Sequence, residues 1–343
     1  MTNAKSQMRQ EIDEIPIAVE RLLTKGAESI RTTSSVIRDV DPAFAITVAR
    51  GSSDHVCTYL KYVSELLLGI PFASVGPSVA SLYRARLRLQ NSLCLSVSQS
   101  GKSPDIIDMA KAARRDGALT VAITNDPNAP LAEASSHVLN LHAGPERSVA
   151  ATKTFLTSAV AGLLLLAEWR GDRGLIDAIH GLPAALDQAT KIDWPAMRDA
   201  IGAETSLFTL GRGPAWAMAN EAALKFKEVC QIHAESYSSA EVLHGPVSIV
   251  DQGFPVLVFA AADAAEDALI GVADGLAEKG ARVFVTSVQP RIATAIEPVR
   301  TKHPLTDPLV LIVSFYAMVE RLAASRGIDP DRPRHLKKVT ETV

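Results

Sequence analysis

Cysteine is scarce in this chain, and neither sign of charge is in excess. Only three of the 343 residues are cysteines, namely Cys57, Cys94 and Cys230, and no CxxC pair is present. The sequence therefore indicates neither a disulfide framework nor a zinc site, and it favours a reduced, cytoplasmic setting. The formal net charge is -3, from 35 Lys plus Arg and 38 Asp plus Glu. This near balance gives no reason to expect nucleic acid or an anionic membrane as a partner.

Long hydrophobic runs and aromatic residues are also few. The longest apolar runs, at 159–167 and 309–319, are well short of the roughly 18 residues of a membrane span. The N-terminus lacks the apolar segment of a signal peptide. Aromatic residues make up only 5% of the chain, so small aliphatic side chains must build its cores. The remainder, 47% hydrophobic and 21% charged, is typical of a folded globular protein of about two domains.

An internal repeat divides the chain into two similar halves. Three segments of the first half, 45–52, 93–98 and 114–124, resemble three segments of the second half in the same order. The second-half segments are 207–214, 255–260 and 277–287. The offsets are 162, 162 and 163 residues (207 − 45, 255 − 93 and 277 − 114). Three matches at nearly one spacing predict two copies of one fold.

Each copy alternates short runs rich in Val, Ile and Leu with helical stretches, which is typical of parallel strands buried on both faces. The expected strands are 43–49, 92–98, 120–124 and 137–140, then 206–210, 255–259 and 282–286. The expected helices are 54–68, 104–116 and 153–169, then 216–230, 266–279 and 307–326. We therefore predict an α/β protein with two tandem doubly wound parallel-sheet domains, each an α/β/α sandwich.

The predicted organisation has five parts. They are an N-terminal helical segment at 1–39, a phosphate-binding domain at 40–170, a connection at 171–199, a domain with acid–base residues at 200–328, and a C-terminal tail at 329–343. Gly and Pro residues mark the connection. The tail is polar and basic, which by composition alone indicates a solvated segment.

Two turns of the first copy are rich in hydroxyl groups, and each follows a strand and opens a helix. They contain Ser52 and Ser53 in one turn and Ser98, Gln99, Ser100 and Ser103 in the other. Ligands of such sheets bind beyond the carboxyl ends of strands, where helix N-termini favour anions. Ordinary helix capping is the alternative, because Ser is a preferred N-cap. Two such turns in one copy favour phosphate binding, and the second-copy turns at 211–214 and 260–263 lack these serines.

The second copy supplies acid–base candidates. Glu221, Lys225 and Glu228 lie at i, i+4 and i+7, on one face of the expected helix. A solvated face of salt bridges is the alternative. The segment that follows, which we expect to be a loop, adds His233 and His244, and histidine beside carboxylates suits proton transfer. A metal site is the rival interpretation, but the two histidines show no standard ligand spacing, so we predict no metal.

These motifs resemble the sugar isomerase (SIS) family, and within it the isomerase half of glucosamine-6-phosphate synthases. The resemblance extends over nearly the whole chain from about residue 10. Five motifs occur in the family's order: SerGlnSerGly at 98–101, AlaThrLysThrPhe at 151–155, the EAALKFKEVCQIHAESY run at 221–237, HisGlyPro at 244–246 and the tail motif at 331–338.

The resemblance implies a role for each candidate. The two serine turns would bind the sugar phosphate. Glu228 would move a proton between C1 and C2, His244 would open the sugar ring, and Lys338 would reach the open-chain carbonyl through a Schiff base. The supporting and pocket-lining residues would be Val149, Glu221, Lys225 and Lys337. The resemblance also implies a phosphorylated amino sugar as substrate, no cofactor, and a homodimer with shared active sites in which His244 comes from the partner.

The resemblance is incomplete at the N-terminus. The synthases carry a glutaminase domain there, and about 40 residues before the first expected strand leave no room for one. We therefore expect the chemistry to run in the opposite sense, as deamination of glucosamine 6-phosphate to fructose 6-phosphate and ammonia. A sugar-phosphate isomerase or a fructosamine-phosphate deglycase is the alternative. A sugar-phosphate sensor is a further alternative, although no helix-turn-helix segment is visible.

Overall fold

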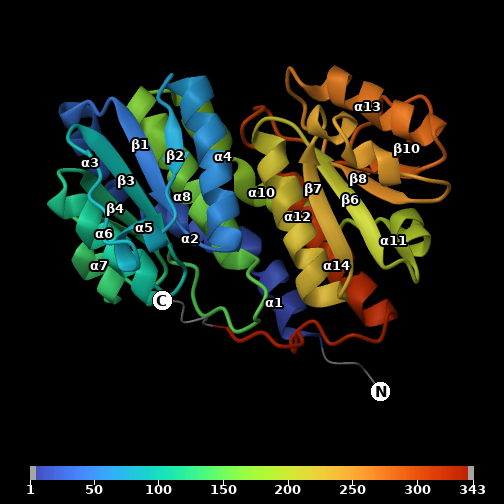
Figure 1. Ribbon diagram of the computed structural model, residues 1–343, viewed down its shortest axis with the longest axis horizontal. Coiled ribbons are helices and arrows are strands. Elements are labelled where there is room, and N and C mark those ends of the chain that lie inside the picture. The colour runs from blue at the N-terminus through green and yellow to red at the C-terminus, as the bar shows by residue number, and fades with distance from the viewer. Residues whose placement is uncertain (1–4, 339–343) are drawn as a thin grey trace. The chain divides into compact units, whose positions relative to one another are not determined.

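A computed structural model describes residues 5–338 of the chain (Figure 1). The chain forms two compact units, each containing one parallel sheet. One comprises Ile17–Glu146, Lys153–His180 and the chain from Lys337. The other comprises the chain up to Pro16, Arg147–Thr152 and Gly181–Leu336. We call them the first-copy unit and the second-copy unit.

The sheet of the first-copy unit has the strand order β2-β1-β3-β4-β5, and every neighbouring pair is parallel. Its strands are β1 (Phe44–Val48), β2 (Phe72–Ser74), β3 (Ser92–Val97), β4 (Leu119–Thr124) and β5 (His137–Asn140). From β1 the chain adds β2 on one side and then returns to add β3 on the other, so the direction of strand addition reverses between the neighbours β1 and β3. In open α/β sheets such a switch point is where ligands bind.

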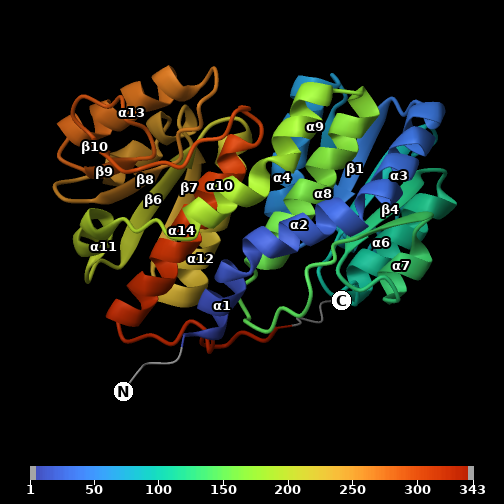
Figure 2. The ribbon, with the colours of Figure 1, turned by 180° about the vertical axis from the view of Figure 1, so that it is seen from behind.

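Helices cover both faces of this sheet. Ile46 and Cys94, on one face, pack against Ile106 of α6 (Pro104–Arg115). Alternate residues such as Ala45 and Leu95 are also fully buried, because they face the opposite helical layer. The other helices of this unit are α2 (Ile15–Lys25), α3 (Ala27–Val40), α4 (Ser52–Leu67), α5 (Ser78–Ser81), α7 (Pro130–Ala134), α8 (Lys153–Arg170) and α9 (Arg173–His180). Figure 2 shows α3 and α8 side by side.

The second-copy unit repeats this sheet. Its order is β10-β9-β8-β6-β7, again all parallel. The strands are β6 (Ser206–Gly211), β7 (His233–Ser238), β8 (Pro255–Val258), β9 (Arg282–Val285) and β10 (Thr294–Ala295). When the strands are renumbered within each copy, both orders are 2-1-3-4-5. The predicted fold class, two doubly wound parallel sheets built by duplication, is therefore confirmed.

The expectation of a loop over 231–237 was wrong. Residues His233–Ser238 form β7, which pairs with β6 from Ser206 to Gly211. This strand lies at the edge of the sheet, where one side is not covered by another strand. Polar side chains are common on edge strands, so its composition resembled that of a loop.

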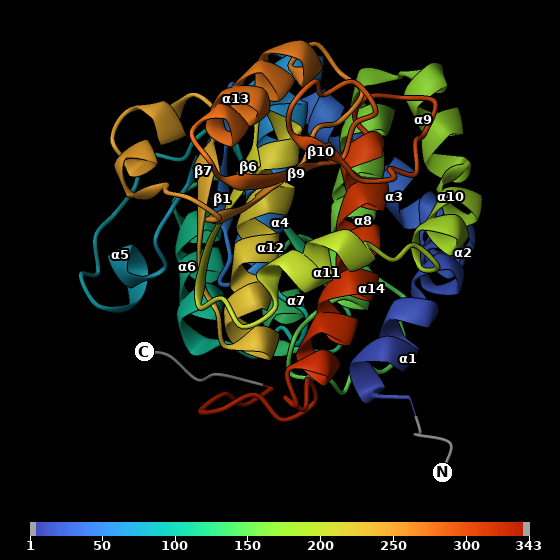
Figure 3. The ribbon, with the colours of Figure 1, turned by 90° about the vertical axis from the view of Figure 1, so that its right-hand side faces the viewer.

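The helices of the second-copy unit include a long apolar pair, α12 (Pro214–Cys230) and α14 (Asp307–Ser325), which lie side by side (Figure 3). Among the described residues, α14 is long and apolar enough by length and composition to span a membrane, which the apolar run alone did not suggest. However, 83% of its most apolar window is buried, as in a core helix of a folded protein. The remaining helices are α1 (Gln7–Asp13), α10 (Leu182–Ala189), α11 (Pro195–Ile201), α13 (Glu266–Glu278) and the 3-10 helices η1 (Glu241–Leu243) and η2 (Pro246–Ile249).

Candidate functional site

The two serine-rich turns of the first-copy unit lie at the same edge of its sheet. They follow β1 and β3, which pair directly up to Val48 and Ser96. Ser52 and Ser53 are the first two residues of α4, and Ser103 is the residue before α6. The structure therefore places these predicted residues at the switch point of the sheet.

Neither N-cap residue at these two helix starts makes a side-chain cap hydrogen bond among the described residues. The N-cap of α4 is Gly51, which has no side chain, and Ser103 makes no side-chain cap hydrogen bond among the described residues. In the second turn, the Ser98 hydroxyl oxygen accepts a bond from the Gly101 N–H at 3.2 Å. The Ser100 oxygen accepts one from the Lys102 N–H at 3.3 Å. Because each hydroxyl accepts here, its own proton remains to be donated to an anion.

Gly101 gives the second turn its tight path. Its φ is +63°, a conformation that L side chains rarely adopt. A Cβ built at this position would lie 2.7 Å from Cβ of Ala129 and 3.1 Å from Oγ1 of Thr124. The turn can therefore pack closely against the β4–α7 loop only with glycine at this position.

An ion pair that the sequence did not suggest connects the two turns. The Arg50 guanidinium, between β1 and α4, donates to one carboxylate oxygen of Asp105 in the first turn of α6. The distances are 3.2 Å from Nε and 2.9 Å from Nη2. The Asp105 side chain is 1% exposed and that of Arg50 is 53% exposed. Lys102 lies beside Asp126 at 4.0 Å, so its positive charge is partly offset.

In the second-copy unit, the three polar residues of α12 form a buried triad rather than a solvated face. Lys225 Nζ lies 3.0 Å from Glu221 Oε1 and 2.6 Å from Glu228 Oε2. The Tyr316 hydroxyl of α14 donates to Glu221 at 3.1 Å. Lys225 and Glu221 are fully buried, whereas the Glu228 side chain is 18% exposed. The solvated alternative is therefore wrong, and Glu228 is the member of the triad that solvent reaches.

The charges of the triad stabilise one another. Burial by itself lowers the pKa of Lys225, but the Glu221 and Glu228 carboxylates outweigh it and hold this pKa above its ordinary value. The lysine is therefore a permanent cation. It fixes one oxygen of Glu228 at hydrogen-bond distance.

The two histidines are not gathered into this triad. His233 begins β7 at the amino end of the sheet, and its Nδ1 lies 3.4 Å from the Ser206 hydroxyl. His244 follows η1 on an exposed turn. Within residues 5–338, no hydrogen bond joins His244 to Glu228. Its proposed role in a partner's active site stays a prediction.

Lys338 pairs with a buried carboxylate that sequence reasoning missed. Its Nζ lies 3.0 Å from Oε2 of Glu146, in the loop after β5. Thr154 also donates to Glu146, from its N–H at 2.9 Å and from its hydroxyl at 2.6 Å. Burial raises the pKa of Glu146, but Lys338 and Thr154 outweigh it, and the pKa lies below its ordinary value. The only signal in the sequence was a glutamate just before the 151–155 motif.

The other tail and pocket residues are placed as follows. Val149 is half-buried, in a short segment whose Ser148 N–H donates to the Glu11 carboxylate at 3.2 Å. Lys337 is exposed. The tail is not simply solvated, because Asp331 accepts the Gln7 N–H at 2.6 Å, at the start of α1. The predicted closure of the tail over an active site stays a prediction, and residues 339–343 lie outside the described residues.

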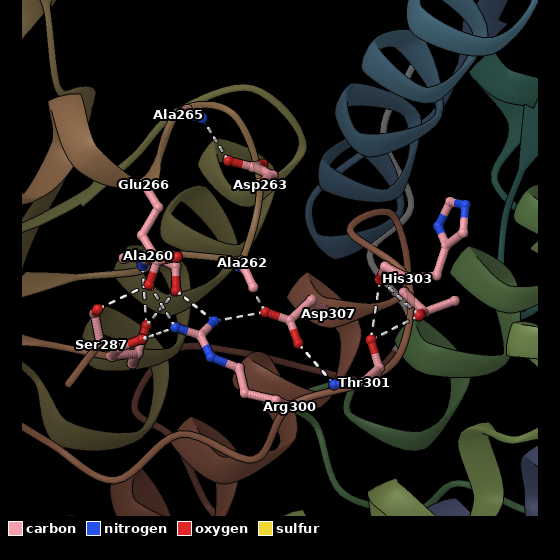
Figure 4. A network of polar contacts seen from close by, with 12 residues as sticks. Ala260, Ala262, Asp263, Ala265, Glu266, Ser287, Arg300, Thr301, His303 and Asp307 are labelled. Carbon is pink, nitrogen blue, oxygen red and sulfur yellow. Dashed lines mark hydrogen bonds and ion pairs between the residues drawn. The ribbon is translucent and has the colours of Figure 1, made fainter. Parts of the chain in front are cut away.

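The matching edge of the second sheet is occupied by the protein's own side chains (Figure 4). Arg300 donates to the Ala260 carbonyl at 2.9 Å and to Asp307 at 2.6 Å. Its other terminal nitrogen donates to Glu266 at 2.8 Å and to the Thr286 carbonyl at 3.0 Å. Arg300 thus contacts the second-copy turn at 260–263, which lacks the serines of the first copy. The two copies therefore carry different side chains at the carboxyl ends of their strands.

No group of three or more His, Cys, Asp or Glu residues within 5–338 could hold a metal ion. The three cysteines are free and buried. Burial raises the pKa of Cys94 and of Cys230 to about 12, so both are held as thiols.

Comparison with known proteins agrees with the fold. The SIS domain family matches residues 43–168 and 201–291. A solved protein from Silicibacter pomeroyi DSS-3, provisionally named a phosphosugar isomerase, is 65% identical with a TM-score of 0.93, and 95% of this chain and 100% of that one are covered. The C-terminal domain of glucosamine-fructose-6-phosphate aminotransferase from Francisella tularensis is 25% identical with a TM-score of 0.85, and 96% and 99% are covered.

A curated relative, glutamine–fructose-6-phosphate aminotransferase (isomerizing) of Methanothermobacter thermautotrophicus, is 32% identical over 341 residues. The match covers 96% of this chain and 56% of the relative. The chain thus spans about half the length of the curated relatives it matches. Fold and turns together define a duplicated α/β protein of the sugar isomerase type. The chain belongs to the SIS domain family and is related to the isomerase half of these aminotransferases.

Proposed function

We propose that this protein is a phosphosugar isomerase that moves a proton between C1 and C2 of an open-chain sugar phosphate. The observation that carries this proposal is the triad on α12, in which a buried lysine fixes a partly exposed glutamate. A carboxylate held in one orientation and reached by solvent suits general base catalysis, which contributes about 10²–10⁴-fold to a rate.

Each residue then has a defined task. The serine turns of the first-copy unit bind the phosphate through hydroxyl and backbone donors. Glu228 Oε2 is held by Lys225, which leaves Oε1 to accept the C2 proton and return it to C1. His244 assists ring opening, and Lys338 reaches the carbonyl carbon of the open chain.

The finer proposal is deamination of glucosamine 6-phosphate. In the open chain, loss of the C2 proton to Glu228 gives an enolamine, and protonation at C1 gives a ketimine at C2. Water adds to the C=N carbon and ammonia leaves, which yields fructose 6-phosphate. The relation to the isomerase half of an enzyme named for glucosamine and fructose 6-phosphate supports this substrate class.

The test is to incubate purified protein with glucosamine 6-phosphate and to measure ammonia and fructose 6-phosphate together. Glu228→Gln should lower the rate by about 10²–10⁴-fold. Glu278→Gln, on the exposed end of α13, is the matched control and should not. Interconversion of glucose 6-phosphate and fructose 6-phosphate without ammonia release would support the isomerase and reject the deaminase. Fructosamine 6-phosphate is tested in the same way. Absence of turnover of all these sugar phosphates would reject both the isomerase and the deaminase.

A further inference from the structure

The two serine turns are separated by about 45 residues of sequence, so chain connectivity does not fix their spacing. Ser53 and Ser98 belong to different βα units, and α4 and α6 begin independently after them. A phosphate group can bind both turns only if their N–H and hydroxyl donors are held at one separation. The pairing of β1 with β3 brings the two strand ends together, and a contact between the turns would fix the remaining separation of their donors.

The Arg50–Asp105 pair is such an interaction. Arg50 is the second residue after β1, and Asp105 is the second residue of α6. Two nitrogens of the guanidinium donate to the same carboxylate oxygen, at 3.2 and 2.9 Å, and the other oxygen accepts the Ile106 N–H at 2.9 Å. The contact therefore joins the start of one turn to the helix that ends the other.

Burial makes this contact strong. A carboxylate that is 1% exposed has little water to stabilise its charge, so it depends on the arginine beside it. Asp105 also lies in the first turn of α6, where the helix dipole favours a negative charge. Separating the turns would break the two hydrogen bonds that Arg50 donates to this buried carboxylate.

The second copy provides an internal comparison. The 162-residue offset places Arg212 at the position of Arg50 and Asp267 at the position of Asp105. Both second-copy side chains are exposed, and among the described residues they form no ion pair with each other. The same residue types are therefore paired in the copy with the serine turns and unpaired in the copy without them.

We propose that Arg50 and Asp105 are positioning residues that hold the two serine turns at the separation a phosphate requires. This inference rests on the proposed phosphate site. In it, Arg50 acts through Asp105, at which the guanidinium edge formed by Nε and Nη2 is directed.

The test measures binding rather than turnover. Isothermal titration calorimetry with fructose 6-phosphate and with inorganic phosphate would compare wild type, Arg50→Gln, Asp105→Asn and the double variant. Each single variant should bind roughly tenfold more weakly, and the double variant no more weakly than either single, as expected for residues that act as a unit. Arg50→Lys should recover only part of the affinity, because lysine keeps the charge but not the two-pronged contact.

Arg212→Gln and Asp267→Asn form the matched control pair and should leave both affinities unchanged. Arg50→Gln removes a positive charge beside a buried carboxylate and can impair folding. The double variant removes both charges, and its far-ultraviolet circular dichroism should match that of wild type.

Three outcomes would overturn the proposal. Weaker binding by Arg50→Gln with unchanged binding by Asp105→Asn would mean that the arginine contacts the phosphate directly. Wild-type affinity in the folded double variant would mean that the Arg50–Asp105 pair does not set the separation of the serine turns. A wild-type protein that binds neither probe would remove the phosphate site itself, which is a failure of the proposed function and is seen before any variant is made.

Discussion

Replacing Lys225 by methionine tests whether the α12 triad is the core of the acid–base site. Methionine keeps most of the volume of the lysine side chain and removes its charge. Glu221, which is fully buried, then keeps the Tyr316 hydroxyl bond but loses its cation, and Glu228 loses the contact at 2.6 Å. Breaking a buried ion pair in this way costs about 3–5 kcal/mol, because a buried charge is left uncompensated.

The cost should be visible as a lower melting temperature. For a unit of between 150 and 250 residues, 1 kcal/mol corresponds to about 2–4 °C, so Lys225→Met should lower Tm by about 6–20 °C. Scanning calorimetry would measure it. The double variant Lys225→Met/Glu221→Gln should recover part of the loss, since it removes both buried charges together. Isomerase activity should fall by at least tenfold in both variants, because Glu228 is no longer fixed.

The pH dependence of this loss has a defined sign. The folded pKa of Lys225 lies above its unfolded value, so its stabilisation is fully present below about pH 10.4 and is lost as the pH rises through the folded value. From pH 6 to pH 9, the lysine should therefore contribute no slope to the difference between variant and wild type. A Lys225→Met protein that melts within about 2 °C of wild type and keeps full activity would refute the role of the triad.

Three further predictions concern other contacts. Glu146→Gln should destabilise the protein more at pH 7 than at pH 3 in urea titrations, because the pKa of Glu146 is lowered in the folded state and its stabilisation is lost as the pH falls through that value; Lys338→Met should reduce the difference. Arg300→Leu should cost about 3–5 kcal/mol in the same titrations, since two carboxylates lose their cation, and should leave phosphate binding by the first-copy unit unchanged. Mixing inactive Glu228→Gln and His244→Ala proteins should restore part of the activity if a partner's His244 completes each site, whereas no recovery would assign one chain to each site.

The fold could be predicted because the same pattern of strands and helices occurs in both halves of the sequence. Strands such as β8, buried at all four positions, appear as continuous apolar runs, and an offset of 162 or 163 residues relates the matching segments of the two copies. Of the four edge strands in the described residues, β5 was predicted and the other three were not. β2 and β10 have three and two residues, and β7 is polar, so neither length nor alternation distinguishes them from turns.

The site was predicted where it depends on local spacing and missed where it depends on distant contacts. The i, i+4, i+7 spacing placed Glu221, Lys225 and Glu228 on one face, but their burial depends on α14, about 90 residues later. Arg50 and Asp105 are 55 residues apart, and Glu146 and Lys338 are 192 apart. Sequence patterns within one element cannot show such pairs, since each member alone resembles an ordinary surface charge.

The two copies differ in the charged groups that lie at the N-termini of their helices. Where helices begin at the edge of a parallel sheet, their N-termini favour negative charge. In the second copy, Glu266 and Asp307 are the first residues of α13 and α14, so the protein supplies its own anions, and Arg300 neutralises them. In the first copy, α4 begins with serines and the carboxylate of Asp105 is tied to Arg50. This difference between the two edges is what the proposed function predicts if the first copy binds the phosphate and the second contributes the catalytic side chains.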